Sequence, residues 1–133
     1  MERQCAKFGL PWTKPVTFPR RALLALRVAL DGADEQWVWE FCKQVMHMNF
    51  VADREIDDVE LIAGILTSLA LPAGELIVRA QSDGAKAALR AQSDEAARRG
   101  VFSAPTFFIG DELFWGNDRL EQALTWCAKP PAP

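Results

Sequence analysis

The 133-residue chain has few of the residues that build metal and redox sites. It contains one histidine, His47, and three cysteines, Cys5, Cys42 and Cys127, none of which lies in a Cys-x-x-Cys arrangement. A zinc site therefore lacks ligands, and a dithiol redox centre is absent from the sequence. Because an odd number of scattered cysteines without a secretory context is typical of reduced thiols, we expect a cytoplasmic protein.

The sequence also lacks long apolar runs and a strong net charge. No segment reaches membrane-spanning length, and residues 1–4 lead into no apolar core of a signal peptide. The formal net charge of −3 gives no general attraction to nucleic acid or to anionic membranes. With 50% hydrophobic and 25% charged residues, the composition is that of an ordinary globular protein. We therefore expect neither a nucleic-acid partner nor a membrane partner.

Helical patterns dominate the chain up to residue 99. We expect helices over residues 2–8, 20–30, 34 to about 50, 57–69, a short stretch from Pro72 to residue 78, and 85–99. Asp57 is predicted to cap its helix while Glu60 reaches back to it, as in a capping box. Pro72 is predicted to lie in the first turn of the next helix, where its missing N–H does no harm. Residues 82–84 are predicted to form a turn.

One helix face is predicted from side chains at three- and four-residue spacing. This face consists of Trp37, Phe41, Val45 and Met48, widened by Trp39 and Cys42. A role of the tryptophans in lining a cofactor site is the alternative, but aromatic residues at helical spacing are more often part of a core. His47 has no acidic or cysteine partner at ligand spacing, so we expect an ordinary helix residue.

The stretch from Gly100 to Leu120 carries a different pattern. Gly100 ends a helix, and Pro105 opens the strand-forming run over residues 106–109. Gly110 and Asp111 then separate this run from residues 113–115, which predicts a β-hairpin with a two-residue turn. Asp118 and Glu121 are predicted to form a capping box for a last helix that ends near residue 127.

Residues 101–109, Val-Phe-Ser-Ala-Pro-Thr-Phe-Phe-Ile, and residues 110–120, Gly-Asp-Glu-Leu-Phe-Trp-Gly-Asn-Asp-Arg-Leu, resemble the C-terminal signature of the 2-hydroxychromene-2-carboxylate isomerases. That family is similar to kappa-class glutathione transferases and to DsbA-type oxidoreductases. The resemblance implies an α/β, thioredoxin-like fold with an inserted helical domain, mostly helical with one C-terminal hairpin. It covers about the C-terminal two-thirds of the family pattern, and the N-terminal β-α-β segment is missing.

The same resemblance implies a domain organisation. Residues 1–99 would form the helical insertion domain with an N-terminal loop, and residues 100–128 the C-terminal ββα part of the thioredoxin-like domain. Residues 129–133, which include three prolines, are predicted to be a disordered tail.

The resemblance further implies a glutathione-binding site. A cis peptide before Pro105 would aim the backbone N–H and C=O of Ala104 at the cysteinyl part of glutathione. At Asn117 and Asp118, a helix start would receive the γ-glutamyl carboxylate, and the Asp118 carboxylate would pair with the ammonium group. Trp115 would line the pocket. From the residues alone, an N-cap is the preferred interpretation of Asp118, and Trp115 could also fill the core.

The function implied by the resemblance is glutathione-dependent cis–trans isomerisation of 2-hydroxychromene-2-carboxylate or a related conjugated aromatic keto acid, a step of aromatic degradation. The family's catalytic serine follows the first strand, so we expect no catalytic residue in this chain. The alternatives are a non-catalytic glutathione-binding or interaction module and a kappa-like glutathione transferase. An unpaired edge of the strand that holds Phe107 and Phe108 would favour a homodimer or other self-association.

Overall fold

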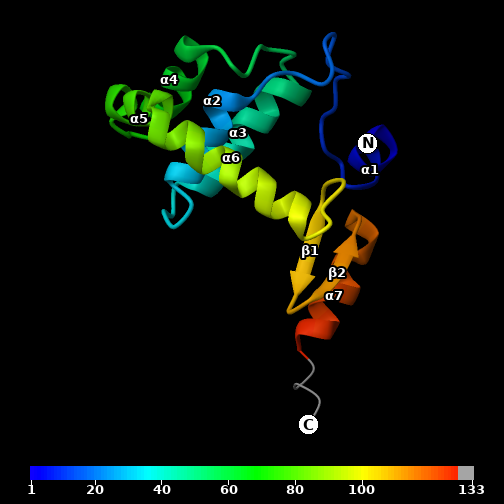
Figure 1. The fold of residues 1–133 in the computed structure, drawn as a ribbon. Helices are drawn as coiled ribbons and strands as arrows, with labels where there is room; N and C mark the ends of the chain where they lie inside the picture. Colours follow the sequence, from blue (N-terminus) through cyan, green and yellow to red (C-terminus); the bar gives the residue numbers. More distant parts are fainter. Residues whose placement is uncertain (129–133) are drawn as a thin grey trace. The chain divides into compact units, whose positions relative to one another are not determined.

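The computed structural model describes residues 1–128, which are mostly helical (Figure 1). The predicted tail, residues 129–133, lies outside the described residues. The elements, in chain order, are α1 (Glu2–Lys7), α2 (Leu23–Asp31), α3 (Val38–Phe50), α4 (Val59–Ser68), α5 (Ala73–Gln81), α6 (Asp83–Arg98), β1 (Thr106–Ile109), β2 (Glu112–Trp115), a 3-10 turn η1 (Asn117–Arg119) and α7 (Leu120–Cys127).

Residue contacts divide the chain into two compact units. Unit 1 comprises Met1–Arg90 and unit 2 comprises Ala91–Pro133. The division falls inside α6, so this helix contributes residues to both units. The predicted domains, residues 1–99 and 100–128, rest on a family architecture rather than on contacts, and they stay a prediction.

The hydrophobic core of unit 1 lies among α2, α3, α4 and α5. Helix α5 packs against α2 and α4, and α3 packs against α4. The largest fully buried side chains are Phe41, Ile62, Leu66 and Val28, one or two from each of α2, α3 and α4. Each of these helices turns an apolar stripe inward, which is the arrangement by which short helices stabilise one another.

The predicted face of α3 is confirmed except at one position. Phe41 and Val45 are buried, and Trp37, Cys42 and Met48 pack against the core. Trp39 is 73% exposed, so its assignment to the same face was wrong. The reason is helical geometry: a residue two positions from Trp37 and two from Phe41 points to the opposite side of the helix.

Five predicted helix starts are shifted along the sequence: α2 and α3 begin three and four residues later than predicted, and α4, α5 and α6 are shifted by one or two residues. Asp58, not Asp57, caps α4, because its Oδ1 accepts hydrogen bonds from the backbone N–H groups of Glu60 and Leu61 at 2.8 and 3.2 Å. Asp57 instead accepts one from the backbone N–H of Leu24 at 2.8 Å. Its carboxylate therefore ties the first turn of α2 to the segment before α4.

The next two helices also begin at neighbouring residues. Pro72 is the N-cap of α5 and lies just outside the helix rather than in its first turn. The turn predicted at residues 82–84 is wrong from Asp83 onward, because α6 begins there. Ser82 supplies the physical reason, since its Oγ accepts a hydrogen bond from the backbone N–H of Ala85 at 3.1 Å.

Arg20 anchors the loop between α1 and α2, a role that sequence reasoning missed. Its side chain is only 3% exposed and donates hydrogen bonds to carboxylates of Asp53 and Glu55, at 2.5 and 3.0 Å. It also reaches the backbone and side-chain oxygens of Asn49, at 3.4 and 3.2 Å. These bonds hold the loop against the end of α3 and the segment that follows it. Asp53 has a left-handed φ of 52°, a conformation that aspartate tolerates better than most residues.

We expect the Arg20–Asp53 pair to make unit 1 sensitive to acid. The Arg20 guanidinium and, second, the backbone N–H of Val16 lower the pKa of Asp53. Because the folded pKa is below the unfolded value of about 3.9, the stabilisation is complete above that value and is lost as the pH falls through the folded pKa. Thermal unfolding of Asp53→Asn should therefore show a lower midpoint near neutral pH and a smaller further decrease in acid.

The control for this measurement is Asp34→Asn, which removes an exposed aspartate that has no ion pair among the described residues. The thermal unfolding midpoint of this variant should equal that of the parent protein at every pH. If the unfolding midpoints of the parent protein and of Asp53→Asn changed in parallel with pH, the role assigned to the Arg20–Asp53 pair would be contradicted.

Unit 2 holds the predicted β-hairpin. Strands β1 and β2 pair antiparallel with Thr106 opposite Trp115 and Ile109 opposite Glu112. Gly110, with φ at 62°, supplies the left-handed residue that the tight turn requires. A cis peptide bond precedes Pro105, as predicted, and a second one, not predicted, precedes Pro19.

Candidate functional site

The open end of the hairpin brings the predicted site residues together. Opposite the Gly110 turn, the start of β1 and the end of β2 are joined by a hydrogen bond of 3.0 Å from the Gly116 N–H to the Pro105 carbonyl. This bond continues the ladder that pairs Thr106 with Trp115. Ala104 and Pro105 therefore lie at the end of the ladder, with Pro105 across from Gly116, and Asn117 and Asp118 follow Gly116 directly in η1. All five predicted residues belong to unit 2.

This end of the hairpin presents unused backbone groups. Within the described part of the chain, neither the N–H nor the C=O of Ala104 has a hydrogen-bond partner, and Ala104 is exposed. The N–H groups of Asn117 and Asp118, the first two residues of η1, are also without one over residues 1–128. Gly116 leads into them with φ at 108°, a value that favours glycine. A polar ligand could therefore bind both segments through main-chain groups alone.

The predicted capping box at Asp118 is wrong. Asp118 lies inside η1, and the N-cap of α7 is Arg119, with no side-chain cap hydrogen bond. The reason is that the 3-10 turn extends the helical conformation back to Asn117, closed by a hydrogen bond of 3.0 Å from the Arg119 N–H to the Gly116 carbonyl. No hydrogen bond or ion pair from residues 1–128 reaches the exposed Asp118 carboxylate. This carboxylate is thus available to a ligand.

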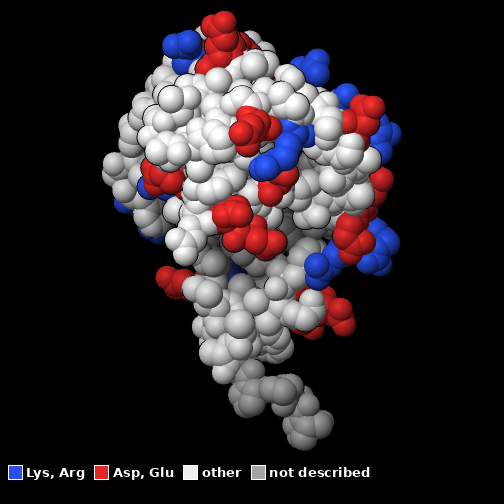
Figure 2. All heavy atoms as spheres, turned by 90° about the vertical axis from the view of Figure 1, so that its left-hand side faces the viewer, with Lys and Arg blue, Asp and Glu red and all other residues white. Residues whose placement is uncertain are grey.

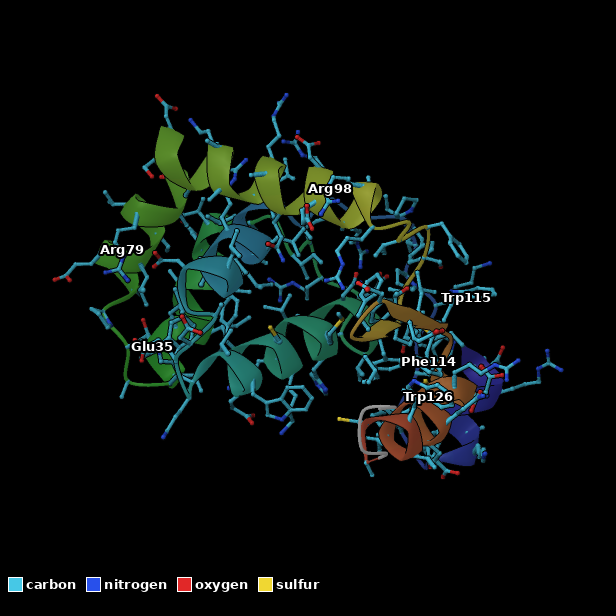
Figure 3. All side chains as sticks on the ribbon, turned by 60° about the horizontal axis from the view of Figure 1, so that its bottom comes forward. Glu35, Arg79, Arg98, Phe114, Trp115 and Trp126 are labelled. Atoms are coloured by element: carbon cyan, nitrogen blue, oxygen red, sulfur yellow. The ribbon has the colours of Figure 1, made fainter. Side chains whose placement is uncertain are left out.

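Trp115 occupies an intermediate position between the two predicted roles. It lies on β2 (Figure 3) and is 50% exposed, so it is not a core residue. One part of its ring system packs on Phe102, with ring centroids 5.0 Å apart. About half of the residue is open to solvent. An aromatic surface of this kind can line a site.

Among the described residues, β1 pairs with β2 only, so its outer backbone edge has no strand partner there. Phe107 and Phe108 are nevertheless half-buried, because α7 packs on β1 and the Arg99 guanidinium lies 3.7 Å from the centre of the Phe108 ring. Arg99 also donates to the Gly110 carbonyl at 3.5 Å. Arg99, the residue after α6, therefore covers the Phe108 ring through a cation–π contact.

Unit 1 contains an apolar cavity that the sequence did not predict. It has a volume of about 560 Å³ and lies between α3 and the stretch from α1 into the following loop. Trp12 and Phe50 stack in its wall, with centroids 5.3 Å apart and ring planes at 24°. Lys43 and His47 also border it, but the surface that it presents is almost entirely apolar. The exposed position of Trp39 is explained here, because its side chain lines this cavity instead of the core.

Other classes of site receive no support from the described residues. Residues 1–128 contain no cluster of three or more His, Cys, Asp or Glu that could hold a metal ion. In that same range, none of the helices has the length and apolar character to cross a membrane. On the face drawn in Figure 2, basic and acidic side chains are interspersed rather than gathered by sign.

Comparisons with known proteins agree with the hairpin signature. A 2-hydroxychromene-2-carboxylate isomerase from Sphingobium xenophagum is 29% identical over 121 residues, which are 91% of this chain and 61% of that protein. The isomerase of the same name from Pseudomonas sp. (strain C18) is 51% identical over 39 residues, or 29% of this chain and 18% of its own length. The one from Pseudomonas putida is 59% identical over 29 residues, or 22% of this chain and 14% of its own.

A solved structure shows the same fold. It is a 2-hydroxychromene-2-carboxylate isomerase with a TM-score of 0.81 at 23% identity, matched over 94% of this chain and 61% of that one. The chain thus spans about three-fifths of the length of these longer relatives. The family model described as "DSBA-like thioredoxin domain" matches residues 1–125. The predicted α/β, DsbA-like thioredoxin fold is confirmed, and the chain belongs to the DsbA-like thioredoxin domain family.

Proposed function

We propose that this chain carries the glutathione-binding part of an isomerase that acts on 2-hydroxychromene-2-carboxylate or a related conjugated aromatic keto acid. The observation that carries the proposal is the open end of the hairpin, where unpaired backbone groups of Ala104, Asn117 and Asp118 accompany an unpaired carboxylate. The relatives named 2-hydroxychromene-2-carboxylate isomerases support the reaction class.

Each group at this end has a partner on glutathione in the proposal. The Ala104 N–H and C=O bind the cysteinyl backbone as an added strand would, through main-chain hydrogen bonds. The N–H groups of Asn117 and Asp118 receive the γ-glutamyl carboxylate, and the Asp118 carboxylate pairs with the ammonium group. Trp115 shields the pocket from solvent. When bound, glutathione supplies a thiolate that adds reversibly to the conjugated system and so permits rotation about the former double bond.

The chain's own residues hold this tripeptide in the proposal, and none of them is assigned to activate the thiol. Two alternatives follow from this division of roles. The chain is then either a glutathione-binding or interaction module without catalysis, or a kappa-like glutathione transferase that conjugates the thiol to an electrophile. Isothermal titration with glutathione tests the binding on which all three depend. A spectrophotometric isomerase assay and a conjugation assay with an activated aryl halide then separate them.

The 133-residue chain should bind glutathione without measurable chromene isomerisation, and it should self-associate through the β1 edge. The physical reason for the second expectation is that the N–H and C=O groups on the outer side of β1 lack strand partners among the described residues. Sedimentation velocity across a range of concentrations measures the association. Phe107→Lys, which places a charge on β1, should reduce it. A monomeric chain with isomerase activity would contradict both expectations.

A further inference from the structure

We infer that Thr106 is a positioning residue, because its hydroxyl group fixes the segment whose backbone would bind the ligand at the open end of the hairpin. Thr106 is the first residue of β1 and lies two positions after Ala104. Its Oγ1 donates a hydrogen bond to the backbone carbonyl of Ser103 at 2.6 Å, so one bond spans both Ala104 and Pro105. That glutathione is the ligand rests on the proposed function, whereas this hydrogen bond is present without any ligand.

The backbone around Ala104 has little else to hold it. In the described part of the chain, the N–H groups of residues 102–104 have no hydrogen-bond partner. The Ser103 carbonyl alone among the carbonyls of these three described residues accepts a hydrogen bond, and its donor is the Thr106 hydroxyl. A free backbone segment must be ordered when a ligand binds through it, and this ordering lowers the affinity. A hydroxyl group that orders the segment beforehand therefore favours binding.

The pairing of the two strands fixes where the Thr106 side chain lies. Because the Gly116 N–H bonds to the Pro105 carbonyl, the next pair, Thr106 and Trp115, is one that exchanges no backbone hydrogen bonds. Side chains of such a pair lie close together on one face of the hairpin. Threonine is also stiff at χ1, so its hydroxyl has few other orientations. The ring of Phe102 packs on Trp115 as well, and the segment before Pro105 is thus attached to the hairpin through side chains.

Nuclear magnetic resonance of the ligand-free protein measures the positioning directly. The Ala104 amide should have an order parameter near that of rigid backbone, about 0.85, in the parent protein. Thr106→Val keeps the branched shape without the hydroxyl group and should lower this value toward about 0.6. Thr106→Ser keeps the hydroxyl group and should preserve the parent value. Unchanged amide signals in the rest of β1 confirm that each variant is folded.

Isothermal titration with glutathione measures the consequence for binding. Thr106→Val should weaken glutathione by about fivefold, the scale of one lost neutral hydrogen bond, and Thr106→Ser should bind as the parent protein does. The matched control is Thr125→Val. Thr125 donates a similar exposed hydrogen bond, to the Glu121 carbonyl at 2.8 Å, but within α7. Its replacement should change neither the affinity nor the order parameter of Ala104.

Three results would overturn the inference. An Ala104 amide equally rigid in the parent protein and in Thr106→Val would show that the hydroxyl group does not fix it. Thr106→Ser behaving like Thr106→Val would assign the effect to the lost methyl group or to strand propensity instead. A mobile Ala104 with unchanged glutathione affinity would remove the positioning role. A parent protein that binds no glutathione contradicts the proposed function alone, because the order parameters still show whether the hydroxyl group fixes Ala104.

Discussion

Replacing Phe41 with alanine should lower the free energy of unfolding of unit 1 by about 3–5 kcal/mol, the largest effect expected from a single change in this chain. Phe41 is 1% exposed, and its ring meets that of Trp37 edge-on with centroids 6.1 Å apart. It also lines an open pocket of about 230 Å³ together with Val45 and Ile56. Truncation would leave a void in the core that the surrounding helices fill only in part. Chemical denaturation followed by far-ultraviolet circular dichroism measures the loss.

Trp39→Ala provides the matched control on the same helix. It removes a larger aromatic side chain that is 73% exposed, so the free energy of unfolding should change by no more than about 0.5 kcal/mol. If Phe41→Ala cost less than about 1 kcal/mol, the helices would have collapsed onto the space, and the core around α3 would be looser than the burial of its residues indicates.

Replacing Asp118 with alanine should weaken glutathione binding by roughly 1.5–3 kcal/mol, the range for a hydrogen bond to a charged group. Since Asp118 caps neither η1 nor α7, the thermal stability of the protein should stay unchanged. A lost helix cap, by contrast, would lower stability by about 1 kcal/mol. Calorimetry of the parent and the variant, together with their unfolding curves, measures both quantities.

Two comparisons sharpen the Asp118 experiment. Asp111→Ala removes an exposed carboxylate at the other end of the same hairpin and should leave affinity unchanged. N-acetylglutathione lacks the ammonium group, so it should bind the parent protein less tightly than glutathione does. The two compounds should bind the Asp118→Ala variant with about equal affinity. Equal affinity of parent and variant for glutathione would remove Asp118 from the site.

The elements that were predictable are those fixed by local chemistry. Gly110 and Asp111 between two apolar runs predicted the hairpin, and the spacing of Phe41 and Val45 predicted the buried face of α3. The starts of α4, α5 and α6 were off by one or two residues, and those of α2 and α3 by three and four. At residues 57 and 58, both aspartates satisfy the local pattern, and the choice depends on Asp57 bonding to Leu24, a contact 33 residues away.

The contacts that depend on distant parts of the chain could not be read from the sequence. Arg20 gave no local signal, because its partners lie 29 to 35 residues further along. The cavity beside α3 was missed for the same reason, since the loop with Trp12 is placed over the helix only by tertiary packing. A weak signal was present: Trp39 lies two residues from Phe41 and therefore off the core face of the helix.

The scarcity of buried side chains in unit 2 has a consequence for its motions. Among its described residues, Ala123 is the only hydrophobic one that is fully buried. Apolar burial is the main term opposing chain entropy, so opening the hairpin costs much less than opening the helices around Phe41. Backbone amides of β1 and β2 should then exchange with solvent deuterium through local opening. Those of α3 and α4 should exchange only through global unfolding. A ligand bound at the open end of the hairpin, in contact with both Ala104 and η1, should therefore slow the exchange of the hairpin amides.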